Sequence, residues 1–403
     1  MKRRILPIFV LSALLLSTNS HAQKNTAFAV TASVKGNFNW NVIREIDLST
    51  GEVIRTLYDP TVNKAVNFKA APGTDLKVNG TVPTSATGFG VAAAAFDALH
   101  NRLYFTGMRA DALSYFDLNS SELNVVVNNN PAFNTGNKND EGNVITRMAI
   151  ASDGYGYAIT NDGKGFIRFT TDQKPTITNL GQLIDGEKND KMSIHAQCSS
   201  WGGDMVGDSY GNLYLVTYRN HLFKINPATR VADYLGAIKG IPAQFTSNGA
   251  VVDNDGELIV TSATTTDNYY RVNISTLDAT PVQKKDAQLF NISDLANSNL
   301  LYQRKGIDNV VFNEIRGNAA VSVFPNPALN KTFNMQFDKV PSGKYNLILT
   351  DASGRAVVSR ALIISVKGQV EKISLPRSAG GGLYLVKLTG NNKEVYNDRV
   401  VVQ

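Results

Sequence analysis

The sequence predicts an all-β fold, and three observations support this prediction. Four segments of the middle region share one pattern: a strand rich in small residues, an acidic turn, and an aromatic or aliphatic strand. Residues 321–403 contain short runs of alternating apolar and polar residues, a period of two that is typical of strands. Asn-Gly and Asp-Gly pairs, which favour two-residue hairpin turns, recur along the chain. We therefore expect a protein almost free of helix.

Residues 1–22 are predicted to be a signal peptide that is cleaved after Ala22. Three basic residues at positions 2–4 precede a mostly apolar run over 5–16, and Ser20-His21-Ala22 follows as a small-x-small cleavage site. The run is shorter than the about 20 residues that a membrane-spanning helix needs. No later apolar run is long enough to cross a bilayer, so we expect no transmembrane segment in the mature chain.

Residues 23–302 are predicted to form a β-propeller. Some of the four repeats continue with a third strand, as at 222–227, and an outer strand, as at 231–235. Four antiparallel strands that recur at this spacing are typical of a propeller blade. Alanine and glycine in the first strand suit sheets that crowd together at a central channel. The turns of the four repeats lie at Asn101, Gly154, Gly211 and Gly256, which are 53, 57 and 45 residues apart.

The two ends of the repeat region complement each other. Strands predicted over 28–33, 42–48 and 52–57 lack a preceding inner strand, whereas residues 289–302 resemble an inner strand without the rest of its blade. Pairing the two ends would close the ring and remove both exposed sheet edges. This count gives five blades, one of them shared, and the length also allows six if residues 61–82 contribute irregular strands.

A linker over 303–320 leads to a predicted small Ig-like β-sandwich at 321–403. The Phe-Pro-Asn-Pro opening at 324–327 disfavours helix, because each proline fixes its own φ and restricts the residue before it. About seven short strands separated by turn sequences are typical of such a sandwich. The alternating runs lie at 332–337, 345–350, 356–359, 372–375, 383–388 and 399–402.

Four motifs follow one another in the C-terminal segment: the Phe-Pro-Asn-Pro opening, Leu347–Asp351 followed by Gly354-Arg355, Gly382–Leu388 and Arg399–Val402. By the order and spacing of these motifs, the segment resembles the type A sorting domain of the type IX secretion system. The resemblance covers about a fifth of the chain, and it departs from the usual pattern at Gln403 and Arg399, where lysine is common. It implies that the secretion machinery is a partner, and that the protein is secreted or attached to the cell surface after passing through the periplasm. The middle region is similar to uncharacterised propellers exported by the same system, which implies no activity. The sorting motif comprises Pro325, Asn326, Pro327, Gly354, Gly382, Tyr384 and Arg399.

The overall charge of +6 does not indicate a nucleic-acid-binding protein. The signal peptide carries +3, and residues 321–403 carry eleven Lys or Arg against five Asp or Glu, a net +6. The middle region is therefore at 6 − 3 − 6 = −3, so we expect no nucleic-acid partner. The single cysteine, Cys198, excludes an intramolecular disulfide.

Three long loops, at 59–87, 128–143 and 185–202, are expected to gather on a face of the disc where ligands commonly bind. The third contains His195 and Cys198, which could act as a base and nucleophile or as two metal ligands. Two ligands do not make a zinc site, so we favour ordinary packing of a buried cysteine. The Asp253–Glu257 segment superficially resembles a calcium loop, but it lacks the required Glu at the twelfth position, and a hairpin turn is favoured.

Binding without catalysis is the function that we expect, with a glycan or a protein as ligand and no cofactor. Trp40 and Trp201, flanked by Asn or Gly, could stack on a sugar ring or a peptide, although both could equally be core residues. The alternative is a hydrolase or lyase with carboxylate or metal chemistry at the channel. For that alternative we consider Asp204 and Asp208, which are four residues apart on an inner strand and could share a face.

Overall fold

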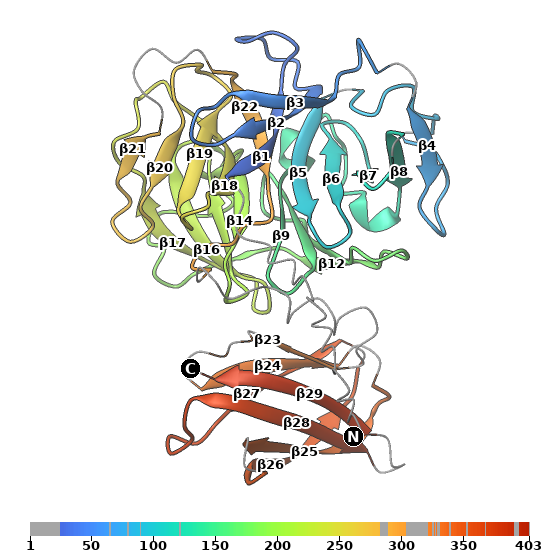
Figure 1. Cartoon of the computed structure of the whole chain (residues 1–403), viewed down its shortest axis with the longest axis vertical. Helices are drawn as coiled ribbons and strands as arrows, with labels where there is room; N and C mark the ends of the chain where they lie inside the picture. The colour runs from blue at the N-terminus through green and yellow to red at the C-terminus, as the bar shows by residue number, and fades with distance from the viewer. Residues whose placement is uncertain are drawn as a thin grey trace, which may run out of the picture.

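The computed structural model describes residues 25–303 and 321–402, apart from 64–65, 79, 89, 121, 283–288, 325, 327, 329–330, 338–339, 352–353, 367 and 391–394. Figure 1 shows two bodies, one built from residues 25–303 and the other from residues 321–402. The predicted signal peptide and all but the first residue of the predicted linker lie outside the described residues. No helix in the described ranges is both long and apolar enough to cross a bilayer.

Five sheets make up the described part of the first body. The strands of each sheet are named below from the centre of the ring outward. The first sheet contains β22 (Ile292–Ala296), β1 (Thr26–Thr31), β2 (Val42–Asp47) and β3 (Val53–Tyr58). The second contains β5 (Val91–Asp97), β6 (Arg102–Gly107), β7 (Leu113–Asp117), β8 (Asn124–Asn128) and β4 (Asn67–Ala70). The third contains β9 (Ile145–Ile150), β10 (Gly156–Thr160), β11 (Phe166–Phe169) and β12 (Ile177–Gly181).

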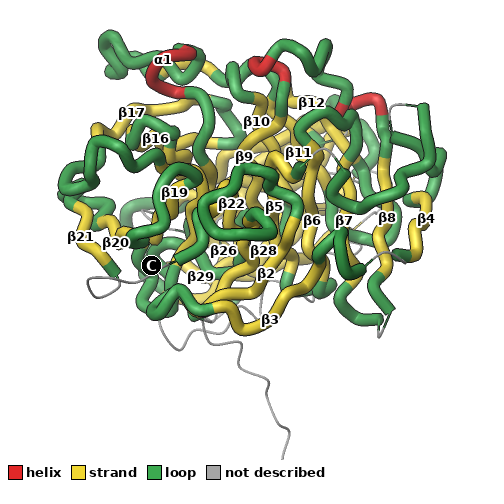
Figure 2. The backbone as a smooth tube through the Cα atoms, turned by 90° about the horizontal axis from the view of Figure 1, so that it is seen from above, coloured by secondary structure: helices red, strands yellow, loops and turns green. Residues whose placement is uncertain are grey.

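The fourth and fifth sheets complete this series. The fourth contains β14 (Asp204–Gly207), β15 (Leu213–Val216), β16 (His221–Asn226), β17 (Val231–Ala237) and β13 (Ile184–Asp185). The fifth contains β18 (Ser247–Val252), β19 (Leu258–Ser262), β20 (Tyr270–Val272) and β21 (Ala279–Pro281). Three short helical turns lie in loops between strands (Figure 2): η1 (Pro131–Phe133), η2 (Glu141–Asn143) and α1 (Gln197–Ser200).

The five innermost strands form a closed ring. Strands β22, β5, β9, β14 and β18 pack against one another in this order, and β18 contacts β22 again. The ring closes where the late strand β22 pairs antiparallel with β1, near the start of the chain. This arrangement is a β-propeller, as predicted. Residues 67–70, from the region considered for a sixth blade, instead form β4, which pairs parallel with β8 at the outer edge of the second sheet.

Small residues on the inner strands let neighbouring sheets approach closely. A Cβ added to Gly249 of β18 would lie 2.5 Å from the hydroxyl of Thr261 and 3.0 Å from the side chain of Leu295 on β22. Larger side chains fill the wider gaps further out, where Tyr104 of the second sheet contacts Phe169 of the third. The core is therefore a series of apolar layers between adjacent sheets.

The turns that follow the inner strands share one hydrogen-bonding pattern, in which a side-chain oxygen accepts from backbone N–H groups of the same turn. In the fifth sheet, Asp253 accepts hydrogen bonds from the backbone N–H groups of Asp255 and Glu257 and also pairs with Arg271. The Asp253–Glu257 segment is therefore a hairpin turn, as favoured from the sequence. The equivalent acceptors at or just after the ends of the other inner strands are Asp97, Asp153, Asp208 and Asn297.

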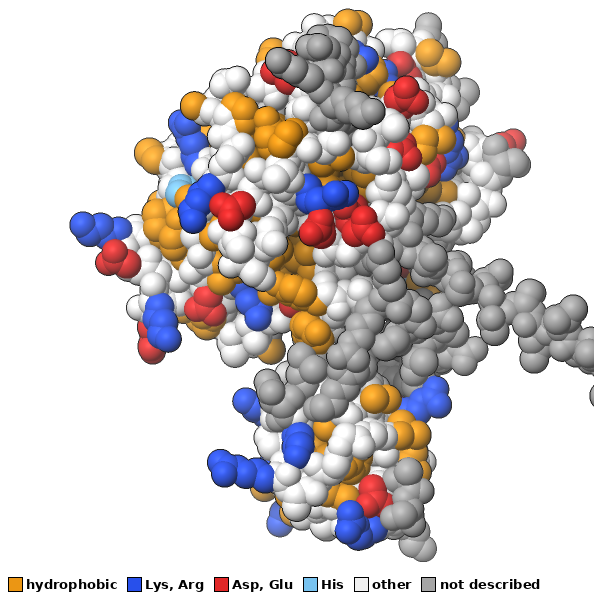
Figure 3. All heavy atoms as spheres, turned by 60° about the vertical axis from the view of Figure 1, so that its left-hand side comes forward, with side chains coloured by type: hydrophobic (Ala, Val, Ile, Leu, Met, Phe, Trp, Pro, Cys, Tyr) orange, Lys and Arg blue, Asp and Glu red, His pale blue; other side chains and the backbone are white. Residues whose placement is uncertain are grey.

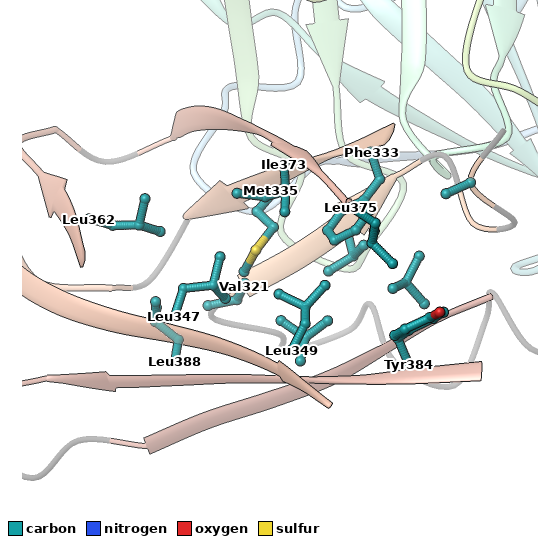
Figure 4. Close-up of a cluster of buried hydrophobic side chains, with 14 of the residues drawn as sticks. Val321, Phe333, Met335, Leu347, Leu349, Leu362, Ile373, Leu375, Tyr384 and Leu388 are labelled. Atoms are coloured by element: carbon teal, nitrogen blue, oxygen red, sulfur yellow. The ribbon is translucent and has the colours of Figure 1, made fainter. Parts of the chain in front are cut away.

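Residues 321–402 form the predicted β-sandwich, with seven strands in the described part of the chain. One sheet has the order β23 (Val321–Phe324), β24 (Thr332–Phe337), β27 (Gln369–Ser374). The other has the order β26 (Ala356–Ile364), β25 (Gly343–Asp351), β28 (Gly382–Gly390), β29 (Val395–Val402). Apolar side chains of the two sheets, among them Met335, Leu347 and Leu388, meet in a single core (Figure 4).

The sorting-motif residues occupy structural positions in this sandwich. The Asn326 side chain donates to the carbonyl of Arg399 and accepts from the N–H of Val401, which ties the start of the domain to β29. Tyr384 is buried, and its hydroxyl donates to the carbonyl of Gly380. Gly354 has a φ of +84° in the turn after β25, Gly382 begins β28, and Arg399 is exposed on β29. Pro325 and Pro327 lie outside the described residues.

Candidate functional site

Each of the three long loops reaches the same face of the propeller, where it leads into an inner strand. Because four antiparallel strands return the chain to the side from which it started, every inner strand begins on the same face. The loops at 59–87, 128–143 and 185–202 each lead into an inner strand, namely β5, β9 and β14. The connections from β1 to β2 (32–41) and from β19 to β20 (263–269) lie on this face as well. We call this surface the loop face.

Phe38 is the exposed aromatic residue at the tip of the 32–41 loop. Its side chain is 64% exposed, whereas Trp40 is only 9% exposed and belongs to the core between the first and second sheets. The two rings meet edge to face with centroids 5.8 Å apart. The Trp40 carbonyl also accepts a hydrogen bond from Val91 at the start of β5. Trp40 therefore supports the loop, and Phe38 is the residue that a ligand could contact.

Asn291 joins two loops of the loop face. Its side chain is almost completely buried, and its oxygen accepts from the N–H of Gly36 at 2.9 Å. Its amide nitrogen donates to the carbonyls of Asn37 and Ala263, at 2.9 and 3.0 Å. One side chain thus fixes the 32–41 loop of the first sheet against the 263–269 loop of the fifth.

A cluster of hydroxyl and amide groups lies on the fifth sheet beside the residues that Asn291 holds. Thr246 donates to the side-chain oxygen of Asn248 at 2.6 Å and lies 3.1 Å from the hydroxyl of Thr264. Ser262 and Thr264 are 2.9 Å apart, and Thr264 is exposed. Ala263, between them, is the residue whose carbonyl Asn291 binds. This part of the loop face therefore combines the exposed ring of Phe38 with polar groups suited to hydrogen bonding.

His195, Cys198 and Trp201 form a locally packed segment. The two ring nitrogens of His195 lie 2.6 Å from the carbonyl of Asp162 and 3.2 Å from that of Leu183. The Trp201 indole donates to the carbonyl of His195 at 3.3 Å. Cys198 lies on α1 with its side chain exposed, so the prediction of a buried cysteine is wrong. The helical turn points this side chain outward, and nothing in the residue pattern before an inner strand indicated a helix there.

Asp204 lies at the loop-face end of the central channel, at the start of β14. Its carboxylate accepts from the backbone N–H groups of Met205 and Ala250, both at 2.7 Å, and of Leu295 at 3.3 Å. It therefore ties β14 to β18 and β22. Burial raises the pKa of the Asp204 carboxyl well above its ordinary value, and the three backbone donors and the nearby Arg147 oppose this effect.

Asp294 of β22 is a second carboxylate in the channel, which the sequence pattern did not single out. Its Oδ1 accepts from the N–H of Ala94 on β5 at 2.9 Å. Burial, and then the charge of Asp204, raise its pKa well above the ordinary value. The two carboxylates are 90 residues apart in sequence, so only the ring closure brings them together.

Arg147 of β9 is a completely buried cation near Asp204. Its guanidinium donates to the backbone carbonyls of Thr160, Asn161, Ser200 and Gly202, so it fastens the loop before β14 to the third sheet. Burial lowers the pKa of Arg147 to about 9, and Asp162 and Asp204 act in the opposite direction.

Asp208 has a different role from Asp204. It lies just after the other end of β14, where it accepts from the N–H groups of Tyr210 and Asn212 and from the Asn212 amide. Both aspartates are completely buried. The structure groups Asp204 with Asp294 and Arg147, and Asp208 with its own hairpin turn. In the described part of the chain, no group of three or more His, Cys, Asp or Glu side chains is arranged to hold a metal ion.

Acidic and basic side chains are intermixed on the side of the propeller shown in Figure 3. The described residues on that side form no extended patch of one sign, and the net charge calculated for the middle region is small, at −3.

Two protein families match parts of the chain. Residues 322–403 match the secretion system C-terminal sorting domain. The chain thus carries a type IX secretion sorting domain, and the protein is secreted or attached to the cell surface. Residues 208–332 match a repeat of unknown function. No curated protein matches the sequence significantly.

Several solved structures are similar to this chain at low sequence identity. One is PorZ, a surface component of the type IX secretion system of Porphyromonas gingivalis, with 16% identity and a TM-score of 0.30 over 93% of this chain; the match spans 51% of that protein. A protein of unknown function from Bacteroides thetaiotaomicron has 15% identity and a TM-score of 0.40, over 70% of this chain and 69% of its own. Virginiamycin B lyase from Staphylococcus aureus has 12% identity and a TM-score of 0.34, over 95% of this chain and 97% of its own.

Proposed function

We propose that this exported propeller is a non-catalytic module that binds a glycan or a protein through its loop face. Phe38 carries the proposal, because an exposed aromatic ring held against a buried one loses little conformational entropy when a ligand covers it. The hydrogen bonds of Asn291 hold the same loop. Exposed Thr264 lies next to Ala263, which Asn291 also binds, and offers a polar partner of the kind that fixes a sugar or a main chain.

Burial of the carboxylates supports binding over hydrolysis or lysis. Asp204 and Asp208, the residues considered for the enzyme alternative, are completely buried, so a substrate cannot contact them in this conformation. Both ring nitrogens of His195 face backbone carbonyls. A general base must reach the proton that it removes, and none of these three groups meets that condition.

The proposal is tested by screening the full chain against an array of bacterial and host polysaccharides and against cell-surface proteins. For the strongest ligand, Phe38→Ala should weaken binding about tenfold or more, the usual effect of removing an aromatic anchor. Leu99→Ala is the matched control, because Leu99 is also half exposed but lies in the turn after β5, on the opposite face. This control should leave the affinity unchanged.

Equal effects of the two substitutions would contradict a site at Phe38. Chemical conversion of the bound ligand by the full chain, abolished by Asp204→Asn, would favour the enzyme alternative instead. Circular dichroism of each variant shows whether the propeller remains folded.

A further inference from the structure

Arg219 is an exposed cation on the loop face. It lies in the connection from β15 to β16 (217–220), which reaches the same face as the 32–41 and 263–269 loops, because all three join the second strand of a sheet to the third. Its guanidinium lies over the ring of Tyr218, with Cζ 4.7 Å from the ring centroid. The guanidinium makes no ion pair and no hydrogen bond with another described residue, so its N–H donors are available to a ligand.

The turn that carries Arg219 is fixed by hydrogen bonds at both of its ends. The N–H of Tyr218 donates to the carbonyl of Trp201 at 3.2 Å. Asn220 has a φ of +63°, and its side-chain amide donates to the carbonyl of Phe245 at 3.2 Å. A cation that is already held in place needs little further ordering when a ligand binds.

A series of contacts connects this turn to the loop that carries Phe38. The side-chain oxygen of Asn220 accepts from the N–H and the hydroxyl of Ser247, which lies between two residues of the polar cluster described above. Asn291 joins Ala263, beside the same cluster, to the 32–41 loop. The free cation, the polar cluster and the exposed ring therefore lie on one connected part of the loop face, across the fourth, fifth and first sheets.

We infer that the ligand of the loop face is an acidic glycan, with a sugar ring on Phe38 and a sugar carboxylate bound by Arg219. This inference rests on the binding function proposed above and specifies its ligand. A guanidinium can donate two parallel hydrogen bonds to a carboxylate, and the hydroxyl and amide groups between the two residues suit sugar hydroxyls. A protein ligand that binds by adding a strand needs a free sheet edge, whereas the loop face presents strand ends and loops.

The full chain is tested against acidic bacterial and host polysaccharides, each paired with its carboxyl-reduced form, which has the same backbone without the charge. We expect an acidic polysaccharide to bind about tenfold or more tightly than its reduced form. Arg219→Gln should remove this preference, and Arg219→Lys should cost less affinity, because it keeps the charge but loses the paired donors. Lys174→Gln is the control, since it removes an exposed positive charge from the turn between β11 and β12, on the opposite face, and it should leave the affinity unchanged.

Equal affinity for acidic and reduced forms, no binding of any acidic polysaccharide, or unchanged binding by Arg219→Gln would overturn the inference. If Phe38→Ala still weakens binding of another ligand in that case, the proposed function stands without the acidic glycan. An absence of any effect of Phe38→Ala contradicts the proposed function itself. Binding confined to polyglutamate and lost in Arg219→Gln would overturn the glycan and indicate an acidic protein segment in its place.

Discussion

Gly203 fixes the backbone where the long loop of the fourth sheet enters the channel. Its φ is +84°, and a Cβ at this position would lie 1.8 Å from the carbonyl oxygen of Val216 on β15. The preceding carbonyl, of Gly202, accepts a hydrogen bond from Arg147, and Asp204 follows directly. Both the turn conformation and the close strand contact therefore require glycine.

Gly203→Ala should destabilise the protein by about 3 kcal/mol or more, because a backbone clash adds to the cost of the left-handed conformation. Gly211→Ala separates the two effects: Gly211 has a φ of +85° but no atom within 4 Å of the added Cβ. That control should cost only about 1 kcal/mol. Urea unfolding followed by fluorescence measures both values. Equal decreases in the free energy of unfolding would show that the clash with Val216 does not contribute.

The residues that could be identified from the sequence are those whose role is local. The turn at Asp253 is formed by donors two and four residues away, so its Asp-x-Asp-Gly sequence predicts it. Asn291 bonds to Asn37 across 254 residues, and Asp294 to Ala94 across 200. No local pattern marks such contacts. Trp40 was considered from the sequence and Phe38 was not, because the burial of each ring depends on how the loop packs on the second sheet.

At the scale of the elements, a single strand, β22, closes the ring. It pairs with β1 on one side and packs against β5 and β18 in the inner ring. This closure could be predicted from the sequence, because each end of the repeat region lacked what the other contained. The role of residues 61–82 could not be decided in the same way, because parallel pairing of β4 with β8 joins segments 57 residues apart.

A variant that lacks residues 285–305 should unfold at a lower urea concentration than the intact chain and should aggregate, since loss of β22 exposes an edge of β1. Removal of residues 67–70 is the control, because β4 lies at the outer edge of its sheet and its loss leaves the ring closed. Similar unfolding midpoints for these two variants would show that β22 does not close the fold.

At the scale of the whole molecule, export depends on the C-terminal sandwich and the proposed binding function on the propeller. The C-terminal sandwich has its own core, and its motifs were specific enough to be identified from the sequence. The propeller was predicted from its repeats, whereas its site was only partly predicted. The loop face follows from the alternation of strand direction. The exposure of Phe38 and the proximity of Asp204 and Asp294 follow from packing between sheets that are distant in sequence. The central claim is that the loop face around Phe38 contacts the ligand.

Hydrogen–deuterium exchange of the full chain, with and without the strongest ligand from the array, measures this contact most directly. We expect slower exchange in the 32–41 and 263–269 loops, which Asn291 holds together, and unchanged exchange in the turns on the opposite face. Slower exchange confined to those opposite turns, at 97–101 and 208–212, would contradict the claim.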